Sequence, residues 1–408
     1  MKQVLGPRAL ITWSVGTTFI FISFLFGKIN ENMAYADVFM PVLLVALIFV
    51  VRSDVDQFIV ALTGLIILYG LISSVSHLYL NGLEIFFSFV IVSRSVAFLI
   101  VLLFFSSAAK RFGLKYLAVF LSVALIATEN TISQYVSGVR TYYGYARVGA
   151  NTAPANTGFL LGILTIGLFA LSLMQFKTKK RITGMTFGLL SVCSLAFAFS
   201  SGSKSSMMGA LIASVVLILY VAGGHQLKRR FVFVASGLVS ALILLVGWSL
   251  VSKQGLIFQS LERFQRFDIS AVDRFGKWVY FFSSSAKELS SPFLFVFAGM
   301  GPGATANFQY QQGSSFFNFD SLLGRMLWEW GPIGVLLWLS LFYFVLVSTY
   351  RRWQPAGIGI GSLYVFAFVY GFGVEFLWIA PSGYIFAALV GMMHGSSYLT
   401  VDRFGANR

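Results

Sequence analysis

The sequence is divided into long apolar runs, each close to the length that a helix needs to cross a lipid bilayer. A spanning helix takes roughly 20 apolar residues to cross about 30 Å of hydrocarbon, because lipid offers no partner to an unpaired backbone group. The runs fall near residues 9–27, 35–51, 58–76, 84–107, 114–130, 155–175, 182–200, 205–223, 231–251, 321–349, 357–375 and 383–399. The pattern predicts an all-α polytopic membrane protein with about 12 transmembrane helices.

Composition agrees with this fold class, since 58% of the residues are hydrophobic and only 11% are charged. The first apolar run follows Lys2 and Arg8, as a signal peptide does, but no small-residue cleavage site clearly follows it. We therefore expect a spanning anchor there. Cys193 is the only cysteine, which excludes an internal disulfide and a metal site built on thiolates.

The distribution of basic residues predicts the orientation in the membrane. The formal net charge is +15, but the basic residues fall mostly in short segments between spans, so topology explains them better than a nucleic-acid partner does. Because short cytoplasmic loops are enriched in Lys and Arg, both termini are predicted to be cytoplasmic. We expect one transmembrane domain over residues 1–408, with residues 252–320 forming a large periplasmic loop between the ninth and tenth spans.

Within this loop, apolar residues such as Phe275, Trp278 and Phe282 recur at helical spacing. The pattern predicts an amphipathic helix lying along the outer membrane surface, with Arg274 and Lys277 on its polar side. Both cations would then lie at the depth of lipid phosphates.

A second predicted outer segment, YARVGANTAPANTG, contains Arg147 ahead of Asn151 and Asn156, and Arg140 lies a few residues earlier. An arginine offers a planar fork of donors that matches phosphate oxygens. These four residues are candidate ligands of an anionic substrate. An interfacial anchor is the alternative role for Arg147.

Two short turns carry weaker signals. In SGSKSS, which joins two spans, Lys204 either caps helix-end carbonyls or helps to hold a diphosphate. In FAGMGPGATANF, Gly299, Gly301 and Gly303 could present backbone donors to an anion. The segment lacks the lysine and the strand-to-helix context of a nucleotide-binding loop, so a plain turn is the favoured interpretation.

Ionisable residues gather where the chain re-enters the membrane after the long loop. Asp320 is followed by Arg325 and Glu329 in the first part of the tenth span, and charges at that depth are functional candidates. The structural alternative is an ion pair of Arg325 with Asp320, or of Arg325 with Glu329 four residues later. Arg94 in the fourth span is a second intramembrane charge, which could serve transport or pair with Glu375.

Metal chemistry is not predicted. Asp54 and Asp56 resemble a metal-binding pair, but they fall in a short cytoplasmic loop, where solvated charges are the better interpretation. His77, His225 and His394 are scattered among span ends. We expect neither a metal nor another cofactor.

The order of these features resembles the bacterial O-antigen ligase and polymerase superfamily, whose members transfer undecaprenyl-diphosphate-linked glycans on the periplasmic face of the inner membrane. The resemblance covers most of the chain. In the ligase branch a histidine precedes a pattern that Ser321, Gly331 and Gly334 keep here, but Asp320 occupies the place of the histidine. Lys204 likewise replaces an expected arginine. Both departures favour a polymerase of lipid-linked repeat units.

The resemblance implies a metal-independent glycosyltransferase in the inner membrane, with a periplasmic active site and lipid-linked glycans as donor and acceptor. Arg147, Arg274 and Lys204 would stabilise the diphosphate leaving group, and Asp320 would be the general base, with Glu329 in reserve. Arg140, Lys277, Arg325, Asn151 and Asn156 are expected to bind substrate. A chain-length-regulating protein is left open as a partner.

Two alternatives remain open from the sequence. A ligase would attach a finished glycan to lipid A core, and a polytopic transporter would use charges such as Arg94 at mid-membrane depth.

Overall fold

The computed structural model describes most of the predicted membrane domain and little of the long loop. Its described residues are 7–25, 28–30, 33–51, 55–81, 85–113, 115, 117–123, 140–142, 145–147, 154–178, 180–200, 203–223, 297–305, 321–372, 376–378 and 382–405. The predicted span at 231–251 and the amphipathic helix that carries Arg274 lie outside these residues.

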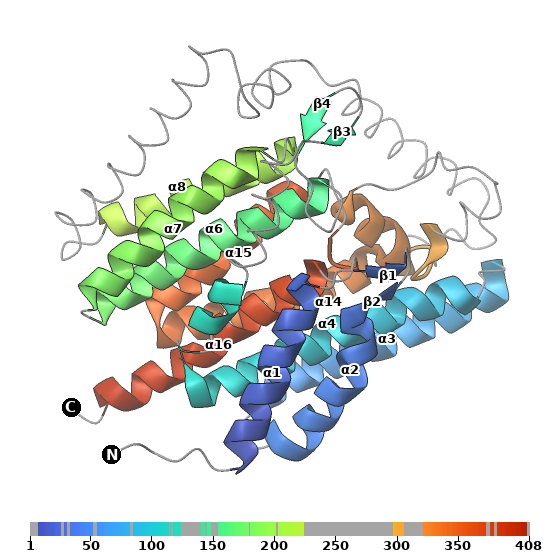
Figure 1. The fold of residues 1–408 in the computed structure, drawn as a ribbon. Coiled ribbons are helices and arrows are strands. Elements are labelled where there is room, and N and C mark those ends of the chain that lie inside the picture. The colour runs from blue at the N-terminus through green and yellow to red at the C-terminus, as the bar shows by residue number, and fades with distance from the viewer. Residues whose placement is uncertain are drawn as a thin grey trace.

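Helices make up nearly all of the described structure (Figure 1). Their bounds are α1 Pro7–Leu25, α2 Tyr35–Ala46 with a π-helical continuation Leu47–Val51, α3 Gln57–Asn81, α4 Ile85–Phe112, α6 Pro154–Lys177, α7 Arg181–Ser200, α8 Lys204–Gly223, α14 Leu322–Arg352, α15 Gln354–Gly371 and α16 Ser382–Gly405. Each coincides with a predicted span, because an apolar run buried in lipid satisfies its backbone groups only as a helix. The predicted turn in SGSKSS is confirmed by the end of α7 at Ser200 and the start of α8 at Lys204.

Two short hairpins lie in the connections between helices, and the all-α fold class is confirmed. β1 (Lys28–Asn30) pairs antiparallel with β2 (Met33–Ala34), and β3 (Arg140–Tyr142) pairs antiparallel with β4 (Tyr145–Arg147). Both hairpins fall in polar connections between apolar runs. These connections carry no periodic apolar pattern from which their secondary structure could be predicted.

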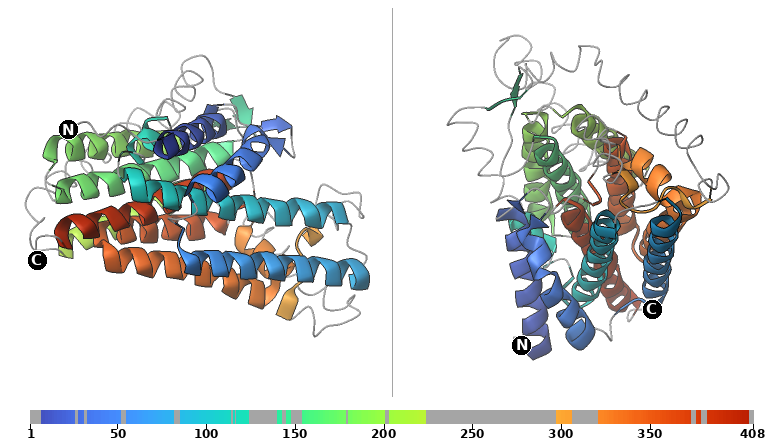
Figure 2. Two further views of the ribbon diagram at one scale, coloured as in Figure 1. Left: turned by 90° about the horizontal axis from the view of Figure 1, so that it is seen from below. Right: turned by 90° about the vertical axis from the view of Figure 1, so that its right-hand side faces the viewer.

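The C-terminal helices α14, α15 and α16 lie between the α1–α4 group and the α6–α8 group (Figure 1). In the end-on view of Figure 2 these three groups run side by side. Small residues permit the closest approaches: a Cβ added at Gly391 of α16 would lie 2.6 Å from the carbonyl oxygen of Leu102 in α4. Residues 382–397 of α16 are buried and lie at the centre of the bundle, whereas α14 keeps exposed side chains such as Leu336, which is 62% exposed.

The outer surface of the bundle is apolar. Many large apolar side chains are exposed on it; Phe49 and Ile182, for example, are 73% and 84% exposed. A surface that faces water rarely carries so many exposed apolar side chains. Five helices among the described residues are long and apolar enough to cross a membrane: Gln57–Tyr79, Ile85–Phe112, Thr157–Lys177, Arg181–Ala198 and Leu322–Arg352. These features are those of a membrane-spanning protein.

Helix α14 is bent, whereas the sequence predicted a regular span. Gly331 has a φ of 62° inside the helix, and Pro332 follows it. The bend separates a short first segment, which carries Arg325 and Glu329, from the longer remainder of the helix.

Candidate functional site

The bend in α14 leaves backbone acceptors that a glycine-rich turn satisfies. Because Pro332 has no N–H, the carbonyl of Trp328 loses its partner four residues later in the helix. The backbone N–H of Met300 donates to this carbonyl at 2.7 Å, and the N–H of Gly301 donates to the carbonyl of Glu329 at 3.0 Å. The turn thus satisfies two helix carbonyls that the bend leaves without their usual partners.

The close approach requires glycine on both sides. Gly299 has a φ of 71°, and a Cβ there would lie 2.6 Å from the backbone nitrogen of Gly331. Gly301 and Gly303 have φ values of 92° and 88°, in the left-handed region that favours glycine. The preference for a plain turn is only partly met. The N–H groups of Met300 and Gly301 bind carbonyls of α14, but those of Gly303 and Thr305 are presented to an anion within the protein, the carboxylate of Glu329.

Glu329 is the electrostatic centre of this region and is fully buried. Its Oε1 accepts from Arg325 Nε at 2.9 Å and from the backbone N–H of Thr305 at 3.1 Å. Its Oε2 accepts from the backbone N–H of Gly303 at 3.1 Å. Three hydrogen-bond donors thus converge on one carboxylate. The ion pair that spacing suggested is therefore present, and the substrate-binding role of Glu329 stays a prediction.

The guanidinium of Arg325 also faces aromatic side chains. It lies 5.6 Å from the ring centroid of Trp378, which stacks on Trp330 with centroids 6.1 Å apart and planes 4° apart. Tyr69 of α3 donates to the carbonyl of Trp330 at 2.7 Å. The arginine is thus held at the end of the bundle, with a side chain that is 10% exposed.

Arg94 and Ser95 of α4 hold the segment that carries Trp378. Arg94 Nη1 donates to the carbonyl of Trp378 at 2.8 Å, and Trp378 Nε1 donates to Ser95 Oγ at 2.9 Å. The suggested partner, Glu375, lies outside the described residues. The bond to Trp378 gives Arg94 a structural role that requires no transported substrate.

Ser321 places the start of α14. Its hydroxyl accepts from the N–H of Gly324 at 3.3 Å and donates to the carbonyl of Gly371 at 3.0 Å, which caps the helix and ties it to α15. Asp320, the predicted base, directly precedes this cap in the sequence but lies outside the described residues.

The hairpin β3–β4 brings two predicted residues together, since its register pairs Arg140 with Arg147. Asn156 lies in the first turn of α6, and Lys204 begins α8 as a half-buried residue. Asn151, Arg274 and Lys277 lie outside the described residues.

Asp56 was expected to be a solvated loop charge, and this expectation is wrong because its carboxylate has partners within the fold. Tyr398 donates to its Oδ2 at 2.7 Å, Arg352 Nη2 lies 3.7 Å from the same oxygen, and the N–H of Phe58 donates to Oδ1 at 3.1 Å. Lys110 lies over the ring of Tyr398 at 4.0 Å. This cluster joins α3, α4, α14 and α16 at the end of the bundle opposite the glycine turn.

Other contacts were missed by sequence reasoning. Asp37 at the start of α2 accepts from the Tyr384 hydroxyl at 2.6 Å and from the N–H of Ala34 at 2.7 Å. Its position at the start of an apolar run was the available signal. In the part of the chain that the structure describes, no group of three or more His, Cys, Asp or Glu residues could hold a metal ion.

Together, the lipid-facing helices and the charged and aromatic cluster at one end define a polytopic membrane protein with a polar site at the end of its bundle. No protein-family model matches the chain. The chain is similar to the ComP-specific O-oligosaccharyltransferase of Acinetobacter baylyi (strain ATCC 33305 / BD413 / ADP1), with 24% identity over 287 residues.

This similarity covers 68% of the present chain and 50% of the relative, so the chain spans about half the length of the curated relative that it matches. The relative's name describes transfer of an oligosaccharide. The similarity confirms the resemblance to the O-antigen ligase and polymerase superfamily.

Proposed function

We propose that the protein is an inner-membrane glycosyltransferase that joins undecaprenyl-diphosphate-linked repeat units into O-antigen or a related surface polysaccharide. The similarity to an oligosaccharyltransferase over 287 residues is the observation that carries glycan transfer. The choice of polymerisation rests on Asp320 and Lys204, which depart from the ligase pattern.

The proposed orientation places both termini in the cytoplasm and the glycine turn toward the periplasm. Lys110, Arg351 and Arg352 belong to the opposite end of the bundle, as the positive-inside rule requires of cytoplasmic ends. Residues 252–320, together with the β3–β4 hairpin, would then face the lipid-linked substrate.

In the proposed reaction, the bond between the anomeric carbon of the donor glycan and its diphosphate oxygen breaks. A new glycosidic bond forms to a hydroxyl oxygen of the acceptor repeat unit, whose proton passes to Asp320. Undecaprenyl diphosphate leaves, and Arg147, Arg274 and Lys204 stabilise the charge that develops on it. No redox step or metal is needed to balance this reaction.

The register of β3–β4 supports an anionic ligand, because it places Arg140 and Arg147 opposite each other along the two strands. A diphosphate has the charge and the oxygen spacing for two guanidinium groups.

The test supplies purified protein with a short-chain undecaprenyl-diphosphate-linked repeat unit from its own source. We expect a product ladder spaced by one repeat, without lipid A core and without added metal. Because the relative is named as specific for ComP, transfer to a separate acceptor is the second candidate function. Product that forms only when lipid A core or another acceptor is supplied would favour that second function.

A further inference from the structure

At the end of the bundle opposite the glycine turn, two cations lie around one aromatic ring. Arg352 is the last residue of α14, and Lys110 lies in the last turn of α4. Both helices are long enough and apolar enough to cross a membrane. A cation at the end of such a helix lies at the depth of lipid phosphates. An anionic headgroup can therefore reach both residues.

The ring belongs to Tyr398 of α16. Lys110 Nζ lies 4.0 Å from its centroid, and Arg352 Cζ lies 3.8 Å from it. Such contacts orient the two cations but do not neutralise them. Asp56 is the carboxylate of this cluster within the part of the chain that the structure describes. Two cations thus face one carboxylate, which leaves an excess of positive charge among these residues.

The guanidinium of Arg352 is incompletely satisfied by this carboxylate. Its Nη2 lies 3.7 Å from Asp56 Oδ2, beyond hydrogen-bond distance, and its Nη1 is buried with no hydrogen-bond partner among the described residues. A buried donor without an acceptor costs stability, so folded proteins rarely keep one. The side chain is 27% exposed, so an acceptor can approach it from outside the bundle. Phosphate oxygens are acceptors that fit the planar fork of an arginine.

Exposed aromatic side chains beside the cluster favour a lipid over a soluble phosphate. Phe58, two residues after Asp56, is 52% exposed and packs on Phe344 of α14 with ring centroids 4.2 Å apart. Tyr350, two residues before Arg352, is 42% exposed. A hydrocarbon chain can cover this apolar surface while its phosphate lies against the cations.

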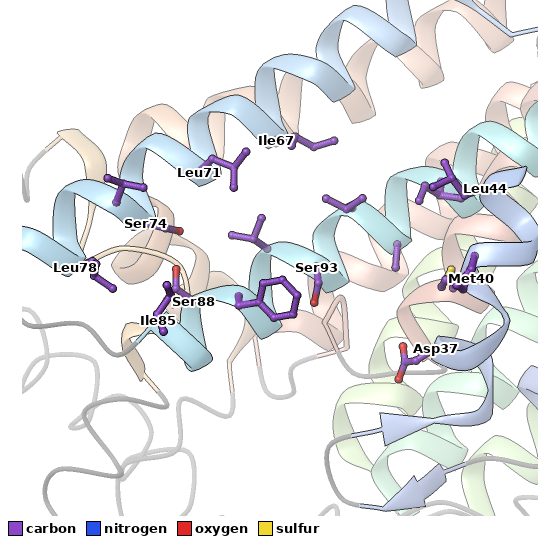
Figure 3. A pocket seen from close by; sticks show the side chains of 17 residues that line it. Asp37, Met40, Leu44, Ile67, Leu71, Ser74, Leu78, Ile85, Ser88 and Ser93 are labelled. Carbon is purple, nitrogen blue, oxygen red and sulfur yellow. The ribbon is translucent and has the colours of Figure 1, made fainter. Parts of the chain in front are cut away.

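The apolar groove between α2, α3 and α4, of about 690 Å³, has the opposite charge (Figure 3). Among the described residues that line it, Asp37 is the only charged one, and its other polar side chains are Ser74, Ser88 and Ser93. A carboxylate repels a phosphate. An anionic headgroup is therefore attracted to the cations of Lys110 and Arg352 and not to this groove.

We propose that Arg352 and Lys110 form a binding site for the phosphate of an anionic phospholipid. The phosphate oxygens accept hydrogen bonds from the guanidinium and the ammonium, and Tyr398 supports both cations. Basic pockets between membrane helices bind anionic headgroups in this way. The site lies at the opposite end of the bundle from the proposed glycan transfer and does not depend on that function.

The test measures lipid binding by the purified, delipidated protein in detergent micelles. Dioleoyl phosphatidylglycerol is the anionic probe, and dioleoyl phosphatidylcholine, which has no net charge, is the reference. Native mass spectrometry gives the dissociation constant of the first bound lipid, and thermal unfolding gives its stabilising effect. We expect the wild type to bind the anionic lipid at least about tenfold more tightly. Equal affinities for the two lipids would overturn the inference.

Arg352→Gln and Arg351→Gln are a matched pair, because they remove the same charge from adjacent positions of α14. Arg351 is exposed, whereas Arg352 is half-buried against Tyr398. We expect Arg352→Gln to weaken phosphatidylglycerol binding by about 30-fold, the effect of losing charge-assisted hydrogen bonds. Arg351→Gln should weaken it by at most about fivefold, the effect of one surface charge. Equal losses in the two variants would mean that only surface charge attracts the lipid and would overturn the site.

Tyr398→Phe separates lipid binding from the integrity of the cluster. It removes the hydroxyl that donates to Asp56 but keeps the ring, so phosphatidylglycerol affinity should stay within about twofold. If Arg352→Gln does not fold, Lys110→Gln compared with Arg111→Gln gives the same contrast at the end of α4. Stabilisation by inorganic phosphate equal to that by phosphatidylglycerol would identify a soluble ligand and overturn the assignment to a lipid.

Discussion

At the scale of single residues, the carboxylate of Glu329 accepts hydrogen bonds from groups of the protein itself. Arg325 Nε and the backbone N–H groups of Gly303 and Thr305 all donate to it. Removing one partner of a buried ion pair leaves an uncompensated charge, which costs more than the pair contributes. Glu329 therefore shapes the site, and Asp320 is left as the proposed base.

The variant Glu329→Gln should lower the free energy of unfolding by about 3–5 kcal/mol, because Arg325 stays buried without its counter-charge. Unfolding in mixed detergent micelles measures this loss. The double variant with Arg325→Met should be less destabilised than the two single variants added together. A strictly additive result would contradict the coupling described here.

The variant Asp320→Asn should slow repeat-unit transfer by about 10²- to 10⁴-fold, the range typical of a lost general base. Single-turnover rates with the purified protein measure it, after membrane insertion has been checked. Asp320→Glu is the matched control and should keep part of the rate. Full polymer length and rate in Asp320→Asn would remove Asp320 from the mechanism.

At the scale of elements, the bend in α14 and the glycine turn form one unit. Pro332 and Gly331 interrupt the helix, and Met300 and Gly301 supply the donors that the interruption removes. A helix that glycine and proline interrupt is thus completed by a segment about 30 residues earlier in the chain.

The variant Gly299→Ala should destabilise the turn and reduce glycan transfer, because its Cβ would lie 2.6 Å from the backbone of Gly331 at a φ of 71°. Thermal unfolding and transfer rate are measured on the same preparation. Gly64→Ala in α3 is the control, since a Cβ there meets nothing within 4 Å. That substitution should be neutral, or stabilise by up to about 1 kcal/mol.

At the scale of the whole molecule, the end of the bundle opposite the glycine turn is stabilised by the Asp56 cluster. Asp56 lies in a loop and contacts Tyr398 of α16 and Arg352 of α14. Burial alone would raise the pKa of Asp56, but hydrogen bonds from the Tyr398 hydroxyl and from the backbone N–H groups of Ile59 and Phe58 help to lower it below the ordinary value.

A lowered carboxyl pKa in the folded state contributes stability above the unfolded value of about 3.9. This contribution is lost as pH falls through the folded pKa. We therefore expect the unfolding midpoint of the wild type to fall more steeply below about pH 4 than that of Asp56→Asn. Parallel pH profiles for the two proteins would show that Asp56 does not stabilise the fold.

The sequence by itself determined the helices and the turn at SGSKSS, because these follow from apolar length, and the four-residue spacing made Arg325–Glu329 one of two possible ion pairs. It did not determine the partners of Arg94 and Asp56 or the backbone donors to Glu329. Those partners are side chains or backbone groups on other elements, such as Trp378 for Arg94, and no local period encodes which helices become neighbours. Packing between distant helices alone decides whether a buried charge is satisfied by the fold or left for a substrate.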